Sequence, residues 1–463
     1  MLQPNLLDRI RPVLATGPQR DSQDAHRFLV RLTRALHTCG LSAPELEEAV
    51  QGVGEALGLH ALALVSPTSL FLSFPGPDAP ELHLERVEPG EIDLGRLVDL
   101  EALVDEVRAG TLGAREALAA LDELERSGSP YAPAWTLAGF SIASLAAGIL
   151  FQVPGRDLPT VAGLGLAVGA LAVLSGGRPR LARVSEPLSA LLATIVALLL
   201  AHAGLVSDPD AVALAALIVL VPGYGLTVAL TELACRHLTS GTTRLFGALG
   251  TFLGLGLGVG LGLALVERTL GPITPVPSTA PGLGATLAAL LMTPLAFGVL
   301  FQVRPRHLGW VALGGLTAYT GARTGTWLVG PELGAGLGAL ALGLTGNVIA
   351  RWKGLPSALA VVPGILLLVP GSIGFRSVAQ FLRHDALAGV ETGFRMAYVA
   401  TCLVGGLLAS YALLPPRSRF SRSDSSGRRV VPSLDPLQPS PAHAASIPPH
   451  PQEEVVTPQG LEP

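Results

Sequence analysis

The chain has 463 residues, of which 49% are hydrophobic and only 14% are charged, whereas an average soluble domain carries about 25% charged residues. This composition excludes a disordered chain and an ordinary soluble enzyme as the whole molecule, and a net charge of −4 provides no basic surface for DNA or RNA. The three cysteines lie far apart and form no disulfide or metal pattern.

Charge is distributed unevenly along the chain. Residues 1–130 hold 11 Arg and 21 Asp or Glu, a net charge of −10, whereas residues 131–415 hold only 15 Arg or Lys and 9 Asp or Glu. Residues 416–463 are rich in Pro and Ser, and we expect them to form a disordered tail. We also expect no signal peptide, because the first 13 residues are charged and lack an apolar core.

Residues 1–130 predict a small soluble α+β domain. Hydrophobic periodicity indicates helices over 28–40, 43–57, 94–108 and 112–126 and strands over 60–65, 69–74 and 81–87. Ser42 and Glu45 form a capping-box pair at the start of the second helix. The four histidines are scattered, and we find no phosphate loop and no nucleophile with a paired base. We therefore expect a regulatory or assembly role, with no catalytic residue, metal or cofactor.

The apolar block contains ten segments long enough to cross a bilayer, which takes about 20 apolar residues per helix. They are 134–151, 159–175, 187–204, 211–234, 243–266, 283–303, 308–329, 333–350, 356–374 and 393–414. Alternate connections and the tail carry 14 Arg or Lys, and the opposite connections carry five. The richer side is expected to face the cytoplasm, which places both termini there.

Two of these segments share a helix-breaking motif. Pro222-Gly223 lies in the fourth segment and Pro370-Gly371 in the ninth, which also carries Pro363-Gly364. Proline removes a backbone donor, and glycine lets the chain leave the helical conformation. The motifs occupy the fourth helix of two five-helix halves, 131–266 and 283–415, joined by an extracytoplasmic linker over 267–282. An odd number of spans per half makes the halves face opposite ways, as in inverted-repeat transporters.

Broken helices predict a binding site. Freed backbone groups cannot face lipid, so protein, water or substrate must satisfy them. The carboxylate of an amino acid suits a helix N-terminus, and its ammonium group suits exposed carbonyls. The alternative is a pair of structural kinks. The candidate substrate-binding residues are Pro222, Gly223, Tyr224, Thr227, Thr231, Glu232, Arg323, Pro363, Gly364, Pro370, Gly371 and Ser372.

Charged residues within spans are rare and usually functional. Glu232 is either an interfacial carboxylate paired with Arg236, four residues on, or a carboxylate coupled to protons or substrate. Arg323 either extends toward the membrane surface or binds an anionic substrate group. Asn347 predicts an interhelical hydrogen bond.

Glycines recur every fourth residue in two segments. Gly250, Gly254, Gly258 and Gly262 form one stripe, and Gly334 and Gly338 begin another. Such stripes predict close helix packing.

The order of these features resembles the threonine/serine exporter family over roughly residues 25–415. Two stretches carry most of the resemblance, LVPGYGLTVALTEL from Leu220 to Leu233 and VPGILLLVPGSIG from Val362 to Gly374. The resemblance implies ten membrane helices, a cytoplasmic N-terminal domain and export of small hydroxy amino acids driven by the proton-motive force. Related split systems are linked to dicarboxylate export, and members often have Asp where this chain has Glu232.

The fold class expected is an α-helical polytopic membrane protein with two inverted five-helix halves. The function expected is secondary export of threonine or serine across a bacterial cytoplasmic membrane. One alternative is export of a dicarboxylate such as succinate, anchored by Arg323; another is a membrane sensor or enzyme that uses the soluble domain. The partners expected are a small-molecule substrate and the lipid bilayer, without nucleic acid, and the sequence leaves open whether the chain forms a homo-oligomer.

Overall fold

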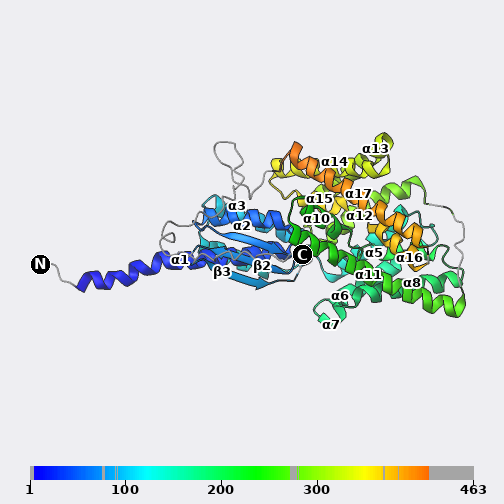
Figure 1. The fold of residues 1–463 in the computed structure, drawn as a ribbon, viewed down its shortest axis with the longest axis horizontal. Coiled ribbons are helices and arrows are strands. Elements are labelled where there is room, and N and C mark those ends of the chain that lie inside the picture. Colours follow the sequence, from blue (N-terminus) through cyan, green and yellow to red (C-terminus); the bar gives the residue numbers. More distant parts are fainter. Residues whose placement is uncertain are drawn as a thin grey trace, which may run out of the picture. The chain divides into compact units, whose positions relative to one another are not determined.

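The structure is a computed structural model that describes residues 5–75, 79–88, 90, 92–271, 279, 281–368, 371–383 and 385–416, with side chains from residue 22 onward. The chain divides into two units, Met1–Ser421 and Arg422–Pro463, and the second lies outside the described residues. Figure 1 traces the elements of the first unit.

The N-terminal region (residues 5–130) contains four helices and a three-stranded sheet among its described residues. The elements are α1 (Asn5–Thr38), α2 (Ala43–Ala56), β1 (Leu62–Ser66), β2 (Ser69–Phe74), β3 (Glu81–Arg86), α3 (Leu94–Arg108) and α4 (Ala114–Arg126). Each predicted element is present, although α1 begins 23 residues before the predicted start at residue 28. The strands pair antiparallel in the order β1-β2-β3, with Leu64 opposite Phe71 and Phe71 opposite Leu84.

The sheet buries one face against the helices. Leu70, Leu72 and Phe74 alternate along β2 and are buried with Phe28 of α1 and Leu46 of α2, as the period of two in a strand requires. The predicted capping box is confirmed at the start of α2, where the Glu45 carboxylate accepts hydrogen bonds from the Ser42 backbone N–H (3.3 Å) and hydroxyl (2.6 Å).

The rest of the described chain is helical. The helices are α5 (Pro133–Leu150), α6 (Leu158–Ser175), α7 (Pro179–Ala182), α8 (Ser185–His202), α9 (Pro209–Ala216), α10 (Gly223–Ala234), α11 (Leu238–Leu270), α12 (Leu283–Leu300), the 3-10 helix η1 (Pro305–His307), α13 (Leu308–Val329), α14 (Pro331–Lys353), α15 (Ala358–Ile365), α16 (Gly371–Leu382) and α17 (Ala386–Leu413).

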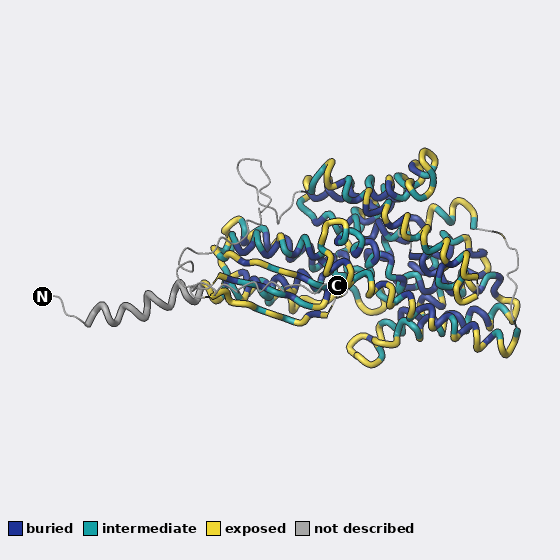
Figure 2. The backbone as a smooth tube through the Cα atoms, viewed as in Figure 1, coloured by how far each residue is buried: buried dark blue, intermediate teal, exposed yellow. Residues whose placement is uncertain are grey.

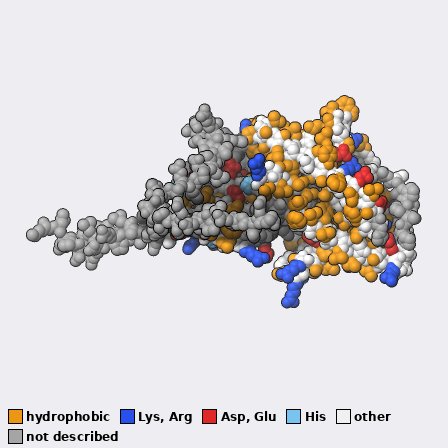
Figure 3. Space-filling view, in the orientation of Figure 1, with side chains coloured by type: hydrophobic (Ala, Val, Ile, Leu, Met, Phe, Trp, Pro, Cys, Tyr) orange, Lys and Arg blue, Asp and Glu red, His pale blue; other side chains and the backbone are white. Residues whose placement is uncertain are grey.

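Seven helices of the described chain, α5, α6, α8, α11, α12, α14 and α17, are long and apolar enough to cross a membrane. Their outward faces are also apolar: α11 exposes Phe246, Leu253 and Leu257 on the side opposite its buried Phe252 and Leu255. A helix that is apolar all round suits lipid rather than water. Figure 2 shows buried positions inside the bundle and exposed ones outside, and Figure 3 shows that hydrophobic side chains cover much of that outer surface.

Three of the ten predicted spans are not among these seven. The predicted spans 211–234 and 356–374 are each divided into two short helices, α9 with α10 and α15 with α16. The third is α13, which is long enough but carries Arg323, a tyrosine and four threonines. The break in two of them agrees with the Pro-Gly motifs that the sequence places there.

The same turn occurs twice, 150 residues apart, after α5 and after α12. Gln152 and Gln302 both adopt a left-handed conformation, with φ of 62° and 58°. The next residue donates its N–H five residues back in both cases, from Val153 to Gly148 (2.9 Å) and from Val303 to Gly298 (2.8 Å). This bonding closes a helix C-terminus as a Schellman motif. The segments read LFQVP and LFQVR, a repeat that our sequence analysis missed.

The helices that precede these two turns pack antiparallel. Gly139, early in α5, contacts Leu300 at the end of α12, whereas Ala146 and Ile149, late in α5, cluster with Ala289, early in α12. The two copies of the turn therefore lie at opposite ends of the helix pair.

The glycine stripes allow the close packing that their spacing predicts, except at Gly250 and at Gly254, where the nearest atoms would lie 3.8 Å from an added methyl group. A methyl group on Gly258 would lie under 3.0 Å from the Pro187 carbonyl oxygen of α8, and one on Gly262 would lie 2.9 Å from Thr194. Gly250 has no atom within 4 Å of that position, so it makes no such contact.

This difference predicts opposite outcomes for two alanine substitutions in α11. Gly258→Ala forces α8 and α11 apart, and we expect it to destabilise the protein by about 1–3 kcal/mol. Gly250→Ala adds a methyl group to open space and is expected to be neutral or to stabilise by up to about 1 kcal/mol. Thermal unfolding in detergent measures both, and equal melting temperatures for the two variants would contradict the packing.

Candidate functional site

The first helix break lies between α9 and α10. After α9 ends at Ala216, residues 217–222 form turns, and α10 begins at Gly223. The Ser144 hydroxyl of α5 donates a hydrogen bond to the carbonyl of Ala216 (3.2 Å), which the end of α9 leaves without a helical partner. The break is therefore held by protein groups and not left to lipid.

The second break lies between α15 and α16. Helix α15 contains Pro363 and Gly364, both buried, and ends at Ile365; α16 begins at Gly371. Gly364 lies against Gly314 of α13, where an added methyl group would come within 3.0 Å of the Gly314 carbonyl carbon. Pro370, one of the predicted site residues, lies outside the described residues.

The two breaks meet. A methyl group on Gly371 would lie 2.7 Å from the Val221 side chain and 3.3 Å from the Gly223 Cα. Gly223 is the first residue of α10 and Gly371 the first of α16, so two helix N-termini, each with partial positive charge, come together. The structure thus brings Pro222, Gly223 and Gly371 to one place.

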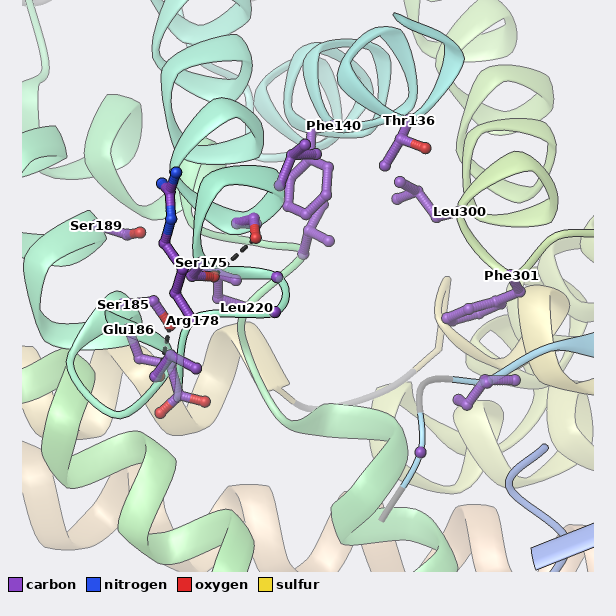
Figure 4. Close-up of a pocket in the computed structure, with 18 of the residues that line it drawn as sticks. Thr136, Phe140, Ser175, Arg178, Ser185, Glu186, Ser189, Leu220, Leu300 and Phe301 are labelled. Atoms are coloured by element: carbon purple, nitrogen blue, oxygen red, sulfur yellow. Dashed lines mark hydrogen bonds between the residues drawn. The ribbon is translucent and has the colours of Figure 1, made fainter. Parts of the chain in front are cut away.

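A cavity of about 940 Å³ reaches the first break (Figure 4). Val219 and Leu220 of the break line it, together with Phe140 of α5, Leu300 of α12 and Phe301. Its polar and charged lining comes from α5, α6, the α7 segment, α8, the turn after α12 and the N-terminal region: Thr136, Ser175, Arg178, Ser185, Glu186, Ser189, Gln302 and Glu88. Our sequence analysis missed these residues, although Glu186 was one of only nine acidic residues in the apolar block.

The two threonines predicted as site residues in α10 donate their hydroxyl hydrogen bonds to backbone carbonyls of the same helix. Thr227 is buried and donates to the Gly223 carbonyl (3.2 Å), and Thr231 donates to the Thr227 carbonyl (2.9 Å). Tyr224 packs against apolar clusters on two sides, one of which includes the N-terminal core. Ser372 follows Gly371 in the first turn of α16 and is half-buried.

Glu232 joins the N-terminal region to the helices. It is buried, with 1% of its surface exposed. Its Oε1 accepts the backbone N–H of Ala43 (3.1 Å), in the first turn of α2, and the Arg244 Nε–H (3.1 Å), while Oε2 accepts the Ser240 hydroxyl (2.8 Å). The ion pair is with Arg244 and not with Arg236, because α10 ends at Ala234 and the expected i, i+4 spacing does not exist.

Further contacts hold the N-terminal region to the turn after α12. The Leu94 N–H donates to the Phe301 carbonyl (2.9 Å), and Asp99 pairs with Arg304. Tyr131, just after the region, donates its hydroxyl to the Val303 carbonyl (2.7 Å). Because Glu232 precedes residue 266 and this turn follows residue 283, the N-terminal region contacts both halves of the apolar block.

A small cavity of about 50 Å³ lies beside this interface, lined by Cys39 and Glu45 from the N-terminal region and by Tyr224 and Val362. Burial raises the pKa of the Glu45 carboxyl, and the hydrogen bonds from Ser42 oppose that rise. Burial also raises the pKa of the Cys39 thiol to about 12, so Cys39 stays protonated and unreactive at neutral pH.

Two other predicted polar residues lie away from the breaks. Arg323 is exposed on α13 and is absent from the lining of the 940 Å³ cavity. Asn347 is buried and donates to the Leu414 carbonyl (2.8 Å), just beyond α17, which confirms the predicted interhelical hydrogen bond.

The Glu232 contacts predict a loss of stability in Glu232→Gln. The amide removes the charge that Arg244 requires and presents a donor where acceptors are needed, so we expect the protein to lose about 3–5 kcal/mol. Glu332→Gln, which breaks a more exposed pair with Arg395 (3.0 Å), is the matched control and should cost about 0–1 kcal/mol. Thermal unfolding and limited proteolysis of residues 5–130 in detergent measure the effect. Equal stability of the two variants would show that Glu232 does not hold the region.

Comparison with known proteins gives a consistent picture across the chain. One model of the threonine/serine exporter family matches residues 27–266, and a second model of the same family matches 286–413. No solved structure matches the chain.

The curated relatives come from fungi and bacteria. A Candida albicans protein named "Pheromone-regulated membrane protein 10" is 28% identical over 85% of this chain, which spans only 36% of that protein's length. The protein of that name from Eremothecium gossypii is 27% identical over 86% of this chain and 57% of its own. A Mycobacterium tuberculosis protein named "Probable threonine/serine exporter" is 25% identical over 84% of this chain and 76% of its own. The family match covers both helix breaks and the N-terminal region, and the chain therefore belongs to the threonine/serine exporter family of multi-pass membrane transporters.

Proposed function

We propose that this protein exports small hydroxy amino acids such as threonine and serine across a bacterial cytoplasmic membrane. It does so as a secondary transporter with ten membrane crossings in two inverted halves, and the proton-motive force drives it. The observation that carries the proposal is the meeting of two helix N-termini, at Gly223 and Gly371, beside a cavity that reaches the first helix break.

The chemistry of this place suits a zwitterion. Two helix N-termini provide partial positive charge and N–H donors for a carboxylate. The turns that precede them provide carbonyl oxygens that are no longer used within a helix. Gly223 and Gly371 are buried and let the two helix N-termini approach each other closely, so we expect a site between them to accept a small amino acid rather than a bulky one.

The repeated turns support movement between two states. Phe301, after α12, lines the cavity next to the N-terminal region. Its counterpart Phe151, after α5, is covered by Arg376, whose guanidinium lies 5.8 Å from the ring centre. Arg383, just after α16, pairs with Asp210 (2.6 Å). Phe151 thus contacts a guanidinium whereas Phe301 borders a cavity, and we propose that the two turns exchange these surroundings during transport, as alternating access between inverted halves requires.

The membrane potential suffices to drive this export. Each charge that moves with the potential is worth about 2.3 kcal/mol per 100 mV, which corresponds to a gradient of more than tenfold.

The alternative of dicarboxylate export lacks a specific anchor. That proposal depended on Arg323, which is exposed on α13 and away from the cavity lining. We therefore assign Arg323 to the membrane surface, and Glu232, whose carboxylate is bonded to three groups, to holding the N-terminal region.

Export of labelled threonine from loaded proteoliposomes tests the proposal. We expect efflux that serine inhibits and succinate does not. Gly371→Ala places a methyl group against Val221 and Gly223, and the overpacking of about 1–3 kcal/mol should slow efflux about tenfold. The matched control is Gly225→Ala, in the same helix as Gly223, where an added methyl group meets no atom within 4 Å. Efflux equal to that of empty liposomes would refute the proposal.

Cysteine labelling tests the proposed orientation. Cys235 is exposed at the end of α10, beside the N-terminal region, whereas Cys39 is buried with its thiol pKa raised to about 12. In a Cys402→Ala background, we expect a membrane-impermeant maleimide to label Cys235 in inside-out vesicles and not in intact cells. Cys235→Ser should abolish the signal. Labelling in intact cells would place the N-terminal region outside.

A further inference from the structure

We propose that Glu186 binds the ammonium group of the substrate, an inference that rests on the proposed function. Glu186 lies in the first turn of α8 and forms part of the wall of the 940 Å³ cavity. Figure 4 shows it with Arg178 on one side of the cavity and Phe301 on the other.

The surroundings of Glu186 leave its charge without a cation. The Glu186 carboxylate accepts a long hydrogen bond from the Thr251 hydroxyl of α11 (3.4 Å). The other charged side chains of the cavity wall are Glu88 and Arg178, both exposed. Among the described residues, neither Arg178 nor any other cationic side chain lies within 4.0 Å of the Glu186 carboxylate. A half-buried carboxylate in such a setting favours a cationic ligand.

The second half of the chain contains the matching carboxylate with its cation present. Glu332 lies in the first turn of α14, which is the third long helix of its half, as α8 is of the first. Each helix packs along the last helix of its half, α14 against α17 and α8 against α11. In α17, Arg395 pairs with Glu332 (3.0 Å), whereas the residues of α11 beside the Glu186 carboxylate are the uncharged Thr251 and Gly254.

Comparison of Glu186 with Glu332 shows that Glu186 lacks a cationic partner from the last helix of its half. Where the repeat-related carboxylate faces a guanidinium of the protein, Glu186 faces a cavity that connects to the helix break. A primary ammonium group fills that role in size and charge, and three ammonium hydrogens suit both the carboxylate and nearby hydroxyl groups such as that of Ser189. The hydroxyl and carboxylate of the substrate are then left for the rest of the site.

Ligand-induced thermal stabilisation of the purified protein tests the inference independently of transport. Three compounds serve as probes: threonine, 3-hydroxybutyrate, which lacks the amine, and 1-amino-2-propanol, which keeps the amine and lacks the carboxylate. We expect the wild type to bind threonine at least about tenfold more tightly than 3-hydroxybutyrate, as for a charge-assisted hydrogen bond. In Glu186→Gln this preference should fall to about twofold or less, and binding of 1-amino-2-propanol should be lost.

Two variants make the result specific to the charge of Glu186. Glu186→Asp keeps the charge and should retain part of the preference. Glu332→Gln, the repeat-related control, should keep the preference of the wild type. Melting temperatures without ligand show that each variant is folded.

The possible outcomes separate this inference from the proposed function. A wild type without preference for the amine, or a Glu186→Gln variant that keeps it, overturns the role of Glu186 even if threonine is exported. An amine preference that depends on Glu186 in a protein that exports no threonine supports the inference and refutes the proposed function.

Discussion

A backbone polar group without a partner is costly in apolar surroundings, and the helix breaks of this protein must satisfy that constraint. Straight helices satisfy it internally, but α9 ends at Ala216 before α10 begins at Gly223, and α15 ends at Ile365 before α16 begins at Gly371. The structure compensates at the first break with the Ser144 hydroxyl, which binds the Ala216 carbonyl. It brings the two new helix N-termini together through the absence of side chains on Gly223 and Gly371. Groups that remain available at such a place can bind a polar solute without facing lipid.

The two halves share a turn and a carboxylate at related positions, but the surroundings of these groups differ between the halves. The turns at Gln152 and Gln302 have the same backbone geometry, yet Phe151 is covered by Arg376 and Phe301 lines a cavity. The carboxylates of Glu332 and Glu186 differ in the same sense, since one is paired with arginine and the other faces the cavity. In the transport cycle proposed above, the inverted halves exchange these states, and the differences between the copies are then the changes that we expect during the cycle.

Local signals in the sequence were enough to predict most elements, and contacts across the fold account for what was missed. Periodicity predicted the strands and helices of the N-terminal region, and the Pro-Gly motifs predicted both breaks. A stripe of glycines predicted close packing, which α11 makes with α8. Arg236 was the wrong partner for Glu232 because the helix ends before it, which local spacing does not reveal. The cavity was missed because its wall combines residues from several segments of the chain. Comparison of LFQVP with LFQVR would have revealed the repeat.

The N-terminal region contacts the first half through Glu232 and the second through Phe301, Val303 and Arg304. Because it is attached to both halves at one end, the N-terminal region resists their separation there. Separation of the halves at that end stretches one set of contacts, so the energy of those contacts enters the balance between the two conformations. By the same linkage, anything that binds or loosens the N-terminal region shifts that balance without contact with the solute. Contacts of this kind can thus couple the N-terminal region to the apolar block through adhesion alone.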